Sequence, residues 1–221
     1  MMPRSHSVVA ASKSGSTRHL AVGDEIVSIA TRVPYPGESL STGVRRLAAE
    51  VIRDHLRGHH DMIRIATVLP SGRPVATDST GPLRVTVSLA HDDGLMAAAA
   101  AERCNVGVDV IASKARSSGL DFWLDPGEQR WEKRAGIPGL LWAAKESAYK
   151  AARLDTPFRP REIAVSPRGD DGFRFTWSNR WHVVIGSGRL LVDEGHVVAV
   201  ATASRHGQRS TASAAERAAC S

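Results

Sequence analysis

Several short stretches of this chain alternate between apolar and polar residues, a pattern typical of half-buried β-strands. In residues 83–89, for example, Val85, Val87 and Leu89 share one face. Alternation, or a content of β-branched or small residues, predicts strands at 25–32, 62–69, 83–89, 95–101, 106–111, 163–165, 173–177, 181–185 and 197–201. The last four stretches are divided by turn residues, so they predict an antiparallel meander.

Three other stretches predict helices. Residues 44–57 have an apolar side and follow Ser41 or Thr42 as a cap. Residues 120–134 read as helical, with a new turn at Asp125–Pro126, because Pro suits the first helical position. The stretch 142–151 lacks Gly, Pro and β-branched side chains, which predicts the interior of a helix from about 140 to 153. Strand, helix and antiparallel strands therefore occur in each half of the chain.

Composition narrows the classes of protein. The 221 residues are 42% hydrophobic, enough for a real core, and no apolar run reaches the roughly 18 residues of a membrane helix. The net charge of +6 favours acidic partners, but the basic residues form no dense run with interleaved aromatics, so nucleic acid is not expected. Cys104 and Cys220 lie far apart, which suits a reducing cytoplasm.

The candidate chemistry lies in two segments. On the helix at 140–153, Trp142, Glu146 and Lys150 share one line because they are four residues apart. By itself, the Glu-to-Lys spacing is typical of an exposed pair worth roughly 0.2–0.5 kcal/mol. About 35 residues upstream, however, Asp109 stands alone in an apolar run, where an unpaired charge is costly.

Together, residues 106–110 (VGVDV) and 142–151 (WAAKESAYKA) resemble the signature pair of the 4′-phosphopantetheinyl transferases, in their larger, monomeric surfactin-synthetase-type branch. The resemblance implies transfer of the phosphopantetheine arm of coenzyme A to a serine of an acidic acyl or peptidyl carrier protein, with release of 3′,5′-ADP. It also implies a cytoplasmic enzyme with no nucleic-acid or membrane partner. The implied fold is α+β: two similar α/β lobes related by a pseudo-twofold axis, each a helix on a mainly antiparallel sheet.

These expectations divide the chain into four parts. The two lobes take residues 21–105 and 106–203, with the metal site and the signature helix in the second. Residues 1–20 contain no acid and are predicted to be a disordered basic arm, and residues 204–221 a disordered tail.

The resemblance also implies roles for single residues. Asp109 and Glu146 would hold Mg²⁺, which prefers roughly six oxygens, normally including water and phosphate oxygens. Lys150 would hold phosphate oxygens, and Lys145 is a further phosphate candidate. Glu128, Glu146 and a metal-bound water remain alternative bases for the serine proton.

Further residues match weaker elements of the family. An arginine early in the first helix grips phosphates of coenzyme A in the family, and Arg45 and Arg46 are both possible here. Arg73 lies in a Gly-Arg-Pro turn like one that faces the nucleotide. Ser88 and His91 lie at a strand end like one that binds coenzyme A in the family, where the histidine contacts the 3′-phosphate, although His91 could equally pair with the aspartates that follow it.

One position departs from the pattern. Many members of the larger branch carry a second acid where this chain has Ile111, so water must complete the metal shell, and weaker metal binding is expected. Ile111 also favours an alternative: a catalytically silent relative that binds coenzyme A or a carrier and has a regulatory role. A basic nucleic-acid-binding module is a third, weaker alternative.

Overall fold

The computed structural model describes residues 16–57, 62–69, 71–92, 94–112, 121–154, 156–180, 182–193, 195–204 and 209–210. Within these ranges the protein is α+β, and all strand pairs are antiparallel. No helix in this part of the chain is long and apolar enough to cross a membrane. The arm predicted at 1–20 is described only from residue 16, and the tail predicted at 204–221 only at residues 204 and 209–210.

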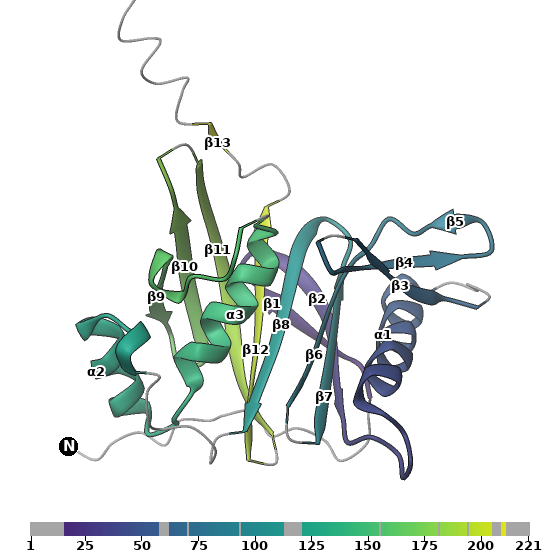
Figure 1. The fold of residues 1–221 in the computed structure, drawn as a ribbon, viewed down its shortest axis with the longest axis horizontal. Helices are drawn as coiled ribbons and strands as arrows, with labels where there is room; N and C mark the ends of the chain where they lie inside the picture. The colour runs from purple at the N-terminus through teal and green to yellow at the C-terminus, as the bar shows by residue number, and fades with distance from the viewer. Residues whose placement is uncertain are drawn as a thin grey trace, which may run out of the picture.

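The first sheet has the strand order β1–β2–β7–β6, and helix α1 covers one of its faces (Figure 1). Its elements are β1 (Arg18–Val22), β2 (Glu25–Arg32), α1 (Leu40–Leu56), β6 (Thr86–Asp92) and β7 (Leu95–Ala101). Helix α1 begins earlier than predicted, because its cap is Ser39, whose hydroxyl accepts a hydrogen bond from the Thr42 amide. Strand β1 takes residues 18–20 from the predicted basic arm.

The second sheet has the order β8–β12–β11–β10–β9, with β13 paired to β11, and helix α3 packs on it. Its strands are β8 (Cys104–Ala112), β9 (Ile163–Arg168), β10 (Gly172–Ser178), β11 (His182–Asp193), β12 (His196–Ser204) and β13 (Arg209–Ser210). The helical segments between β8 and β9 are η1 (Asp121–Trp123), α2 (Pro126–Ala135), α3 (Leu140–Ala152) and η2 (Pro160–Glu162). The predicted meander is confirmed, with a longer β11 than expected.

A third, small sheet contains β3 (Arg64–Val68), β4 (Arg73–Asp78) and β5 (Gly81–Pro82). It lies beside α1, away from the second sheet (Figure 1). The turn between β3 and β4 includes Gly72, which has a φ of 70° and therefore favours glycine. This turn reaches toward the C-terminal end of α3, where Arg73 donates a hydrogen bond to the carbonyl of Arg153.

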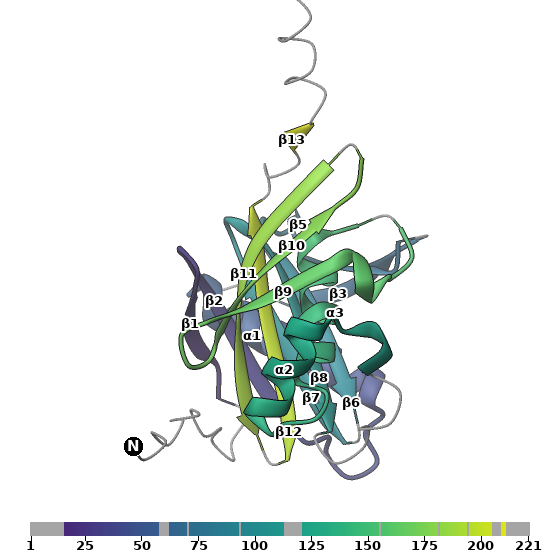
Figure 2. The same ribbon diagram turned by 90° about the vertical axis from the view of Figure 1, so that its left-hand side faces the viewer.

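The two large sheets pack face to face between the helices, as the side view also indicates (Figure 2). Alternate residues of β8 divide between two cores. Val106, Val108 and Val110 face the first sheet, while Ile111 packs with α3. Because side chains alternate along a strand, Gly107 and Asp109 share the side of Ile111 and face α3.

Helix α3 approaches β8 closely at Gly107. A Cβ atom at this position would lie 2.0 Å from the carbonyl oxygen of Ser147 and 2.5 Å from the amide nitrogen of Ala151. Only glycine fits under the helix here, and the next residue on the same face is Asp109. The close approach therefore places the aspartate directly beneath the helix.

We expect Gly107→Ala to destabilise the protein by about 1–3 kcal/mol, the usual cost of overpacking a core. The free energy of unfolding in denaturant measures this loss. Gly127→Ala is the control, because a Cβ atom there meets side chains and no backbone, Asp125 at 3.0 Å and Arg130 at 3.9 Å, and alanine is favoured over glycine within a helix. Equal stability of the two variants would contradict the close approach.

Candidate functional site

The structure brings together three of the predicted site residues. Lys150 of α3 donates from Nζ to Asp109 Oδ1 of β8 at 2.7 Å and to the carbonyl oxygen of Val108 at 3.0 Å. Glu146 lies one helical turn before Lys150, and its carboxyl is near enough to Asp109 to raise the pKa of the Asp109 carboxyl. Two carboxyls and an ammonium therefore meet where α3 crosses β8.

The surroundings of Asp109 change the ionisation of its carboxyl. Burial raises the pKa of its carboxyl to about 7, with only 6% of the residue exposed. The Lys150 ammonium lowers this pKa, and the nearby Glu146 carboxyl raises it. A divalent cation between the two carboxyls would favour their ionised forms.

A basic cavity of about 250 Å³ lies next to this group and extends from Lys150 toward the turn between β3 and β4. Among the described residues that line it, four are basic and none is acidic; the basic ones are Arg45, Arg73, Lys150 and Arg153. These side chains come from α1, from β4 and from the C-terminal end of α3, so both halves of the chain contribute to the lining. Such a lining attracts anions, and phosphate groups in particular.

The cavity separates the two arginines that the sequence left as alternatives. Arg45 lines the cavity and donates to the hydroxyl of Thr67 at 3.3 Å and to Ser41. Arg46 instead pairs with Glu38 at 2.7 Å and stacks on the ring of Tyr35. Of the two arginines, only Arg45 is placed to reach a ligand in the cavity.

Arg73 and Ser88 also line the cavity. The Ser88 hydroxyl is already engaged, because it accepts a hydrogen bond from the Val108 amide at 3.0 Å. His91 is exposed near the end of β6 and is not among the residues that line the cavity. Its ring makes no hydrogen bond with any residue in the described ranges, so no pairing with Asp92 is seen, and Asp93 lies outside those ranges.

Glu128 and Lys145 do not join the group, and the structure places them in a buried ion pair. Lys145 Nζ lies 2.9 Å from Glu128 Oε1 and donates to the carbonyls of Pro160 and Ile163. Glu128 also accepts hydrogen bonds from the amides of Asp125 and Val165.

These contacts occupy the three protons of the Lys145 ammonium and both oxygens of the Glu128 carboxyl. The pair lines a different cavity from that of Lys150. Roles for Lys145 as a phosphate contact and for Glu128 as a base are therefore not supported by their positions.

Ile111 occupies the position where many family members carry a second acid. It is buried in the core beneath α3, and a Cβ atom on Gly139 would lie 2.9 Å from its Cδ1. Within the described residues, no group of three or more His, Cys, Asp or Glu side chains is arranged to hold a metal. The residues present fit a Mg²⁺ ion held by Asp109 and Glu146, with water and phosphate oxygens as its remaining ligands.

Arg153 is the residue of the cavity that the sequence analysis missed. It follows Lys150 by three residues, and positions three apart share a helix face, so this spacing could have revealed it. It caps α3 with a φ of 51°, and its carbonyl accepts the hydrogen bond from Arg73. The position of Arg153 in the cavity lining therefore depends on where α3 ends.

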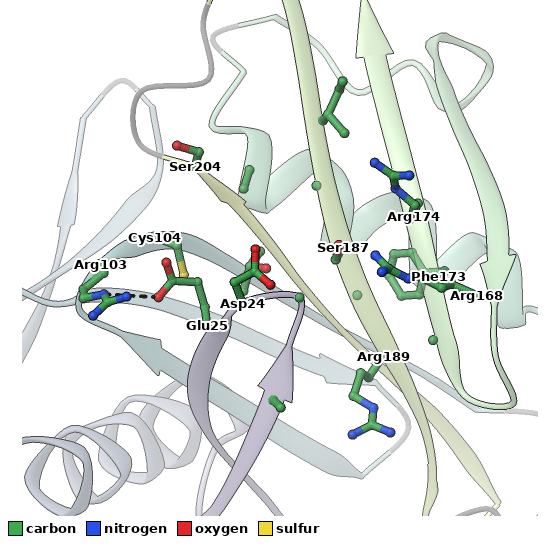
Figure 3. A pocket seen from close by; sticks show the side chains of 18 of the residues that line it. Asp24, Glu25, Arg103, Cys104, Arg168, Phe173, Arg174, Ser187, Arg189 and Ser204 are labelled. Atoms are coloured by element: carbon green, nitrogen blue, oxygen red, sulfur yellow. Dashed lines mark ion pairs between the residues drawn. The ribbon is translucent and has the colours of Figure 1, made fainter.

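A second, larger cavity of about 570 Å³ lies between the β1–β2 turn and the strands β10 to β12 (Figure 3). Its charges are mixed. Arg103 pairs with Glu25 at 3.7 Å, Arg189 pairs with Asp171 at 2.7 Å, and Asp24 also lines it. Three acidic side chains, Asp24, Glu25 and Asp171, lie among its basic ones, so the smaller cavity is the better candidate for an anionic substrate.

We expect Asp109→Asn to raise the melting temperature at pH 8 by about 3 °C or more, measured in a chelator. The pKa of this carboxyl is raised in the folded protein, so the unfolded chain releases the proton more readily. The stability lost by the wild type therefore grows as the pH rises from about 4 through about 7. The difference in melting temperature between the variant and the wild type should be smaller at pH 5. An equal difference at pH 5 and pH 8 would contradict the conclusion that burial raises the pKa of Asp109.

The chain was compared with protein-family models and with curated proteins, and neither comparison found a match. Its function is therefore inferred from the group Asp109, Glu146 and Lys150 and from the basic cavity beside it.

Proposed function

We propose that this protein is a 4′-phosphopantetheinyl transferase, which moves the phosphopantetheine arm of coenzyme A to a serine of a carrier protein and releases 3′,5′-ADP. One observation carries the proposal. Two acids from distant segments, Asp109 and Glu146, meet the Lys150 ammonium at the edge of a cavity that four basic residues line.

The basic cavity supports coenzyme A as the substrate. The nucleotide end of coenzyme A carries a 3′-phosphate and a pyrophosphate, and Arg45, Arg73 and Arg153 supply guanidinium groups that suit phosphate oxygens. The volume of about 250 Å³ is slightly below the range of about 300–1,000 Å³ for ligand pockets. The cavity thus fits the phosphate-bearing end, and the pantetheine arm would extend past Lys150.

The reaction is attack by a serine hydroxyl on the β-phosphorus of the pyrophosphate, and its main demands are alignment and charge neutralisation. Lys150 would hold phosphate oxygens and stabilise the charge that develops on the departing ADP. Asp109 and Glu146 would hold Mg²⁺, which supplies positive charge to the pyrophosphate when bound. Glu146 remains a candidate base for the serine proton, because it lies beside Asp109 and Lys150, whereas the Glu128 carboxyl is occupied by two amides and by Lys145.

The fold is compatible with two similar lobes, because each large sheet is antiparallel and carries a helix on its outer face. In this proposal the lobes take residues 21–105 and 106–203, and the site lies where they meet. The net charge of +6 suits an acidic carrier domain as the partner. We further propose a cytoplasmic monomer, the expectation for this branch of the family.

The direct test is incubation of the protein with apo-carrier proteins of the fatty-acid, polyketide and peptide-synthetase classes, together with coenzyme A and Mg²⁺. Transfer adds the mass of phosphopantetheine to the carrier, which mass spectrometry detects. If no carrier gains this mass while coenzyme A still binds, the regulatory relative becomes the better explanation.

We expect Asp109→Ala and Glu146→Ala each to abolish transfer, because either change removes a carboxylate that the metal requires. Lys150→Ala should lower kcat by about 100-fold or more, in the range found when a charge-stabilising donor is lost. Steady-state rates of carrier modification, with circular dichroism as the check on folding, measure these effects. Near-normal turnover of a folded Asp109→Ala or Glu146→Ala variant would remove the proposed metal site.

Arg45 and Arg46 form a matched pair of variants. Arg45→Ala should raise the KM for coenzyme A by about tenfold, the value of one charged hydrogen bond, while kcat changes less. Arg46→Ala should leave the KM unchanged, because its guanidinium pairs with Glu38 outside the cavity. The reverse order of effects would mean that the nucleotide lies elsewhere.

A further inference from the structure

The edge of β8 that faces away from β12 has unusual hydrogen-bond partners. The amide of Val108 donates to the Ser88 hydroxyl, and the amide of Ala112 donates to Asp92 Oδ2, each at 3.0 Å. Both partners are side chains of β6, a strand that belongs to the other large sheet. Side chains of β6 therefore replace the backbone ladder that a neighbouring strand would supply.

The peptide groups of Val108 are held from two sides. In a strand, the amide and the carbonyl of one residue point in the same direction, so the Val108 carbonyl also points away from β12. That carbonyl accepts a hydrogen bond from Lys150 Nζ at 3.0 Å. The same Nζ donates to Asp109, the next residue along the strand, at 2.7 Å.

A chain of hydrogen bonds thus links β6 to α3. The Ser88 hydroxyl accepts from the Val108 amide, and the Val108 carbonyl accepts from Lys150 Nζ, which also donates to Asp109. Ser88 is only 4% exposed, and its oxygen already accepts the Val108 proton. Loss of this acceptor would leave a buried amide without a partner, and the strand would have to shift to recover one.

We propose that Ser88 is a positioning residue for the transfer reaction rather than a contact to coenzyme A. By fixing the Val108 amide, it holds this part of β8 in place, and with it the Val108 carbonyl and Asp109, to which Lys150 donates. Lys150 and Asp109 thereby keep the positions that the reaction needs. This inference rests on the proposed function and differs from the role that the family resemblance implies for Ser88, which is binding of coenzyme A.

Strand β6 offers a matched control. The hydroxyl of Thr86 also joins β6 to β8, because it donates to the carbonyl of Cys104 at 2.7 Å and to that of Ala101 at 3.0 Å. Cys104 is the first residue of β8, whereas Val108 contacts Lys150 directly. Thr86→Val therefore removes a similar hydrogen bond between the sheets and leaves the Val108 carbonyl, to which Lys150 donates, unchanged.

The experiment compares Ser88→Ala, Ser88→Thr and Thr86→Val by carrier modification and by melting temperature. We expect Ser88→Ala to lower kcat at saturating coenzyme A and Mg²⁺ by about tenfold to 100-fold, since small misplacements of reacting groups cost that much. The KM for coenzyme A should change by less than about twofold, because no ligand contact is lost. Thr86→Val should keep kcat even where its melting temperature falls, and Ser88→Thr should restore it, because threonine retains the hydroxyl.

A raised KM with an unchanged kcat in Ser88→Ala would overturn the inference and make Ser88 a contact to coenzyme A. Equal losses of kcat in Ser88→Ala and Thr86→Val would also overturn it, because they would reflect stability alone. If Ser88→Ala does not fold, Ser88→Cys replaces it, since a thiol has nearly the same shape and is a weak acceptor.

Hydrogen exchange measured by NMR tests the inference without activity. In Ser88→Ala the Val108 amide should exchange faster than in the wild type, while the Ala112 amide, held by Asp92, should not change. The Cε resonance of Lys150 should shift as its ammonium loses its place. If wild type transfers nothing to any carrier, the proposed function fails, and unchanged exchange and resonance would then refute the positioning by Ser88 separately.

Discussion

The site depends on how closely helix α3 lies on strand β8. The absence of a side chain at Gly107 lets the helix backbone descend onto the strand, and this brings Lys150 within hydrogen-bond distance of Asp109. The same descent removes Asp109 from water, so a carboxyl that is usually ionised at neutral pH becomes costly to ionise. Backbone packing thus controls the electrostatics of the site.

Charge is arranged unevenly around this crossing. Two carboxyls lie where α3 meets β8, while the charged residues described in the lining of the adjoining cavity are all basic. A ligand with phosphate groups would meet guanidinium groups in the cavity and, at one end, the two carboxyls that we propose as metal ligands. The larger cavity has no such separation, because two of its arginines are already paired with acids (Figure 3).

Much of the fold could be predicted from local sequence. Strand β7 and helix α3 match their predicted ranges closely, because alternation and helix propensity are local properties. The start of α1 differed because Ser39 caps it, and several residues near the true start suit a cap equally well. The juxtaposition of Asp109 with Glu146 and Lys150 followed from the family resemblance. The pairing of Lys145 with Glu128 could not be read from spacing, because it depends on which face of α3 turns toward β9.

Strand β7 shows how narrow the tolerance of this fold is. It contains five consecutive alanines, 97 to 101, which alternate between the core beneath α1 and the core between the two large sheets. Methyl groups therefore set the thickness of both layers. A larger residue on either face of this run would have to separate α1 or the second sheet from the strand, so only the smallest side chains fit at residues 97 to 101.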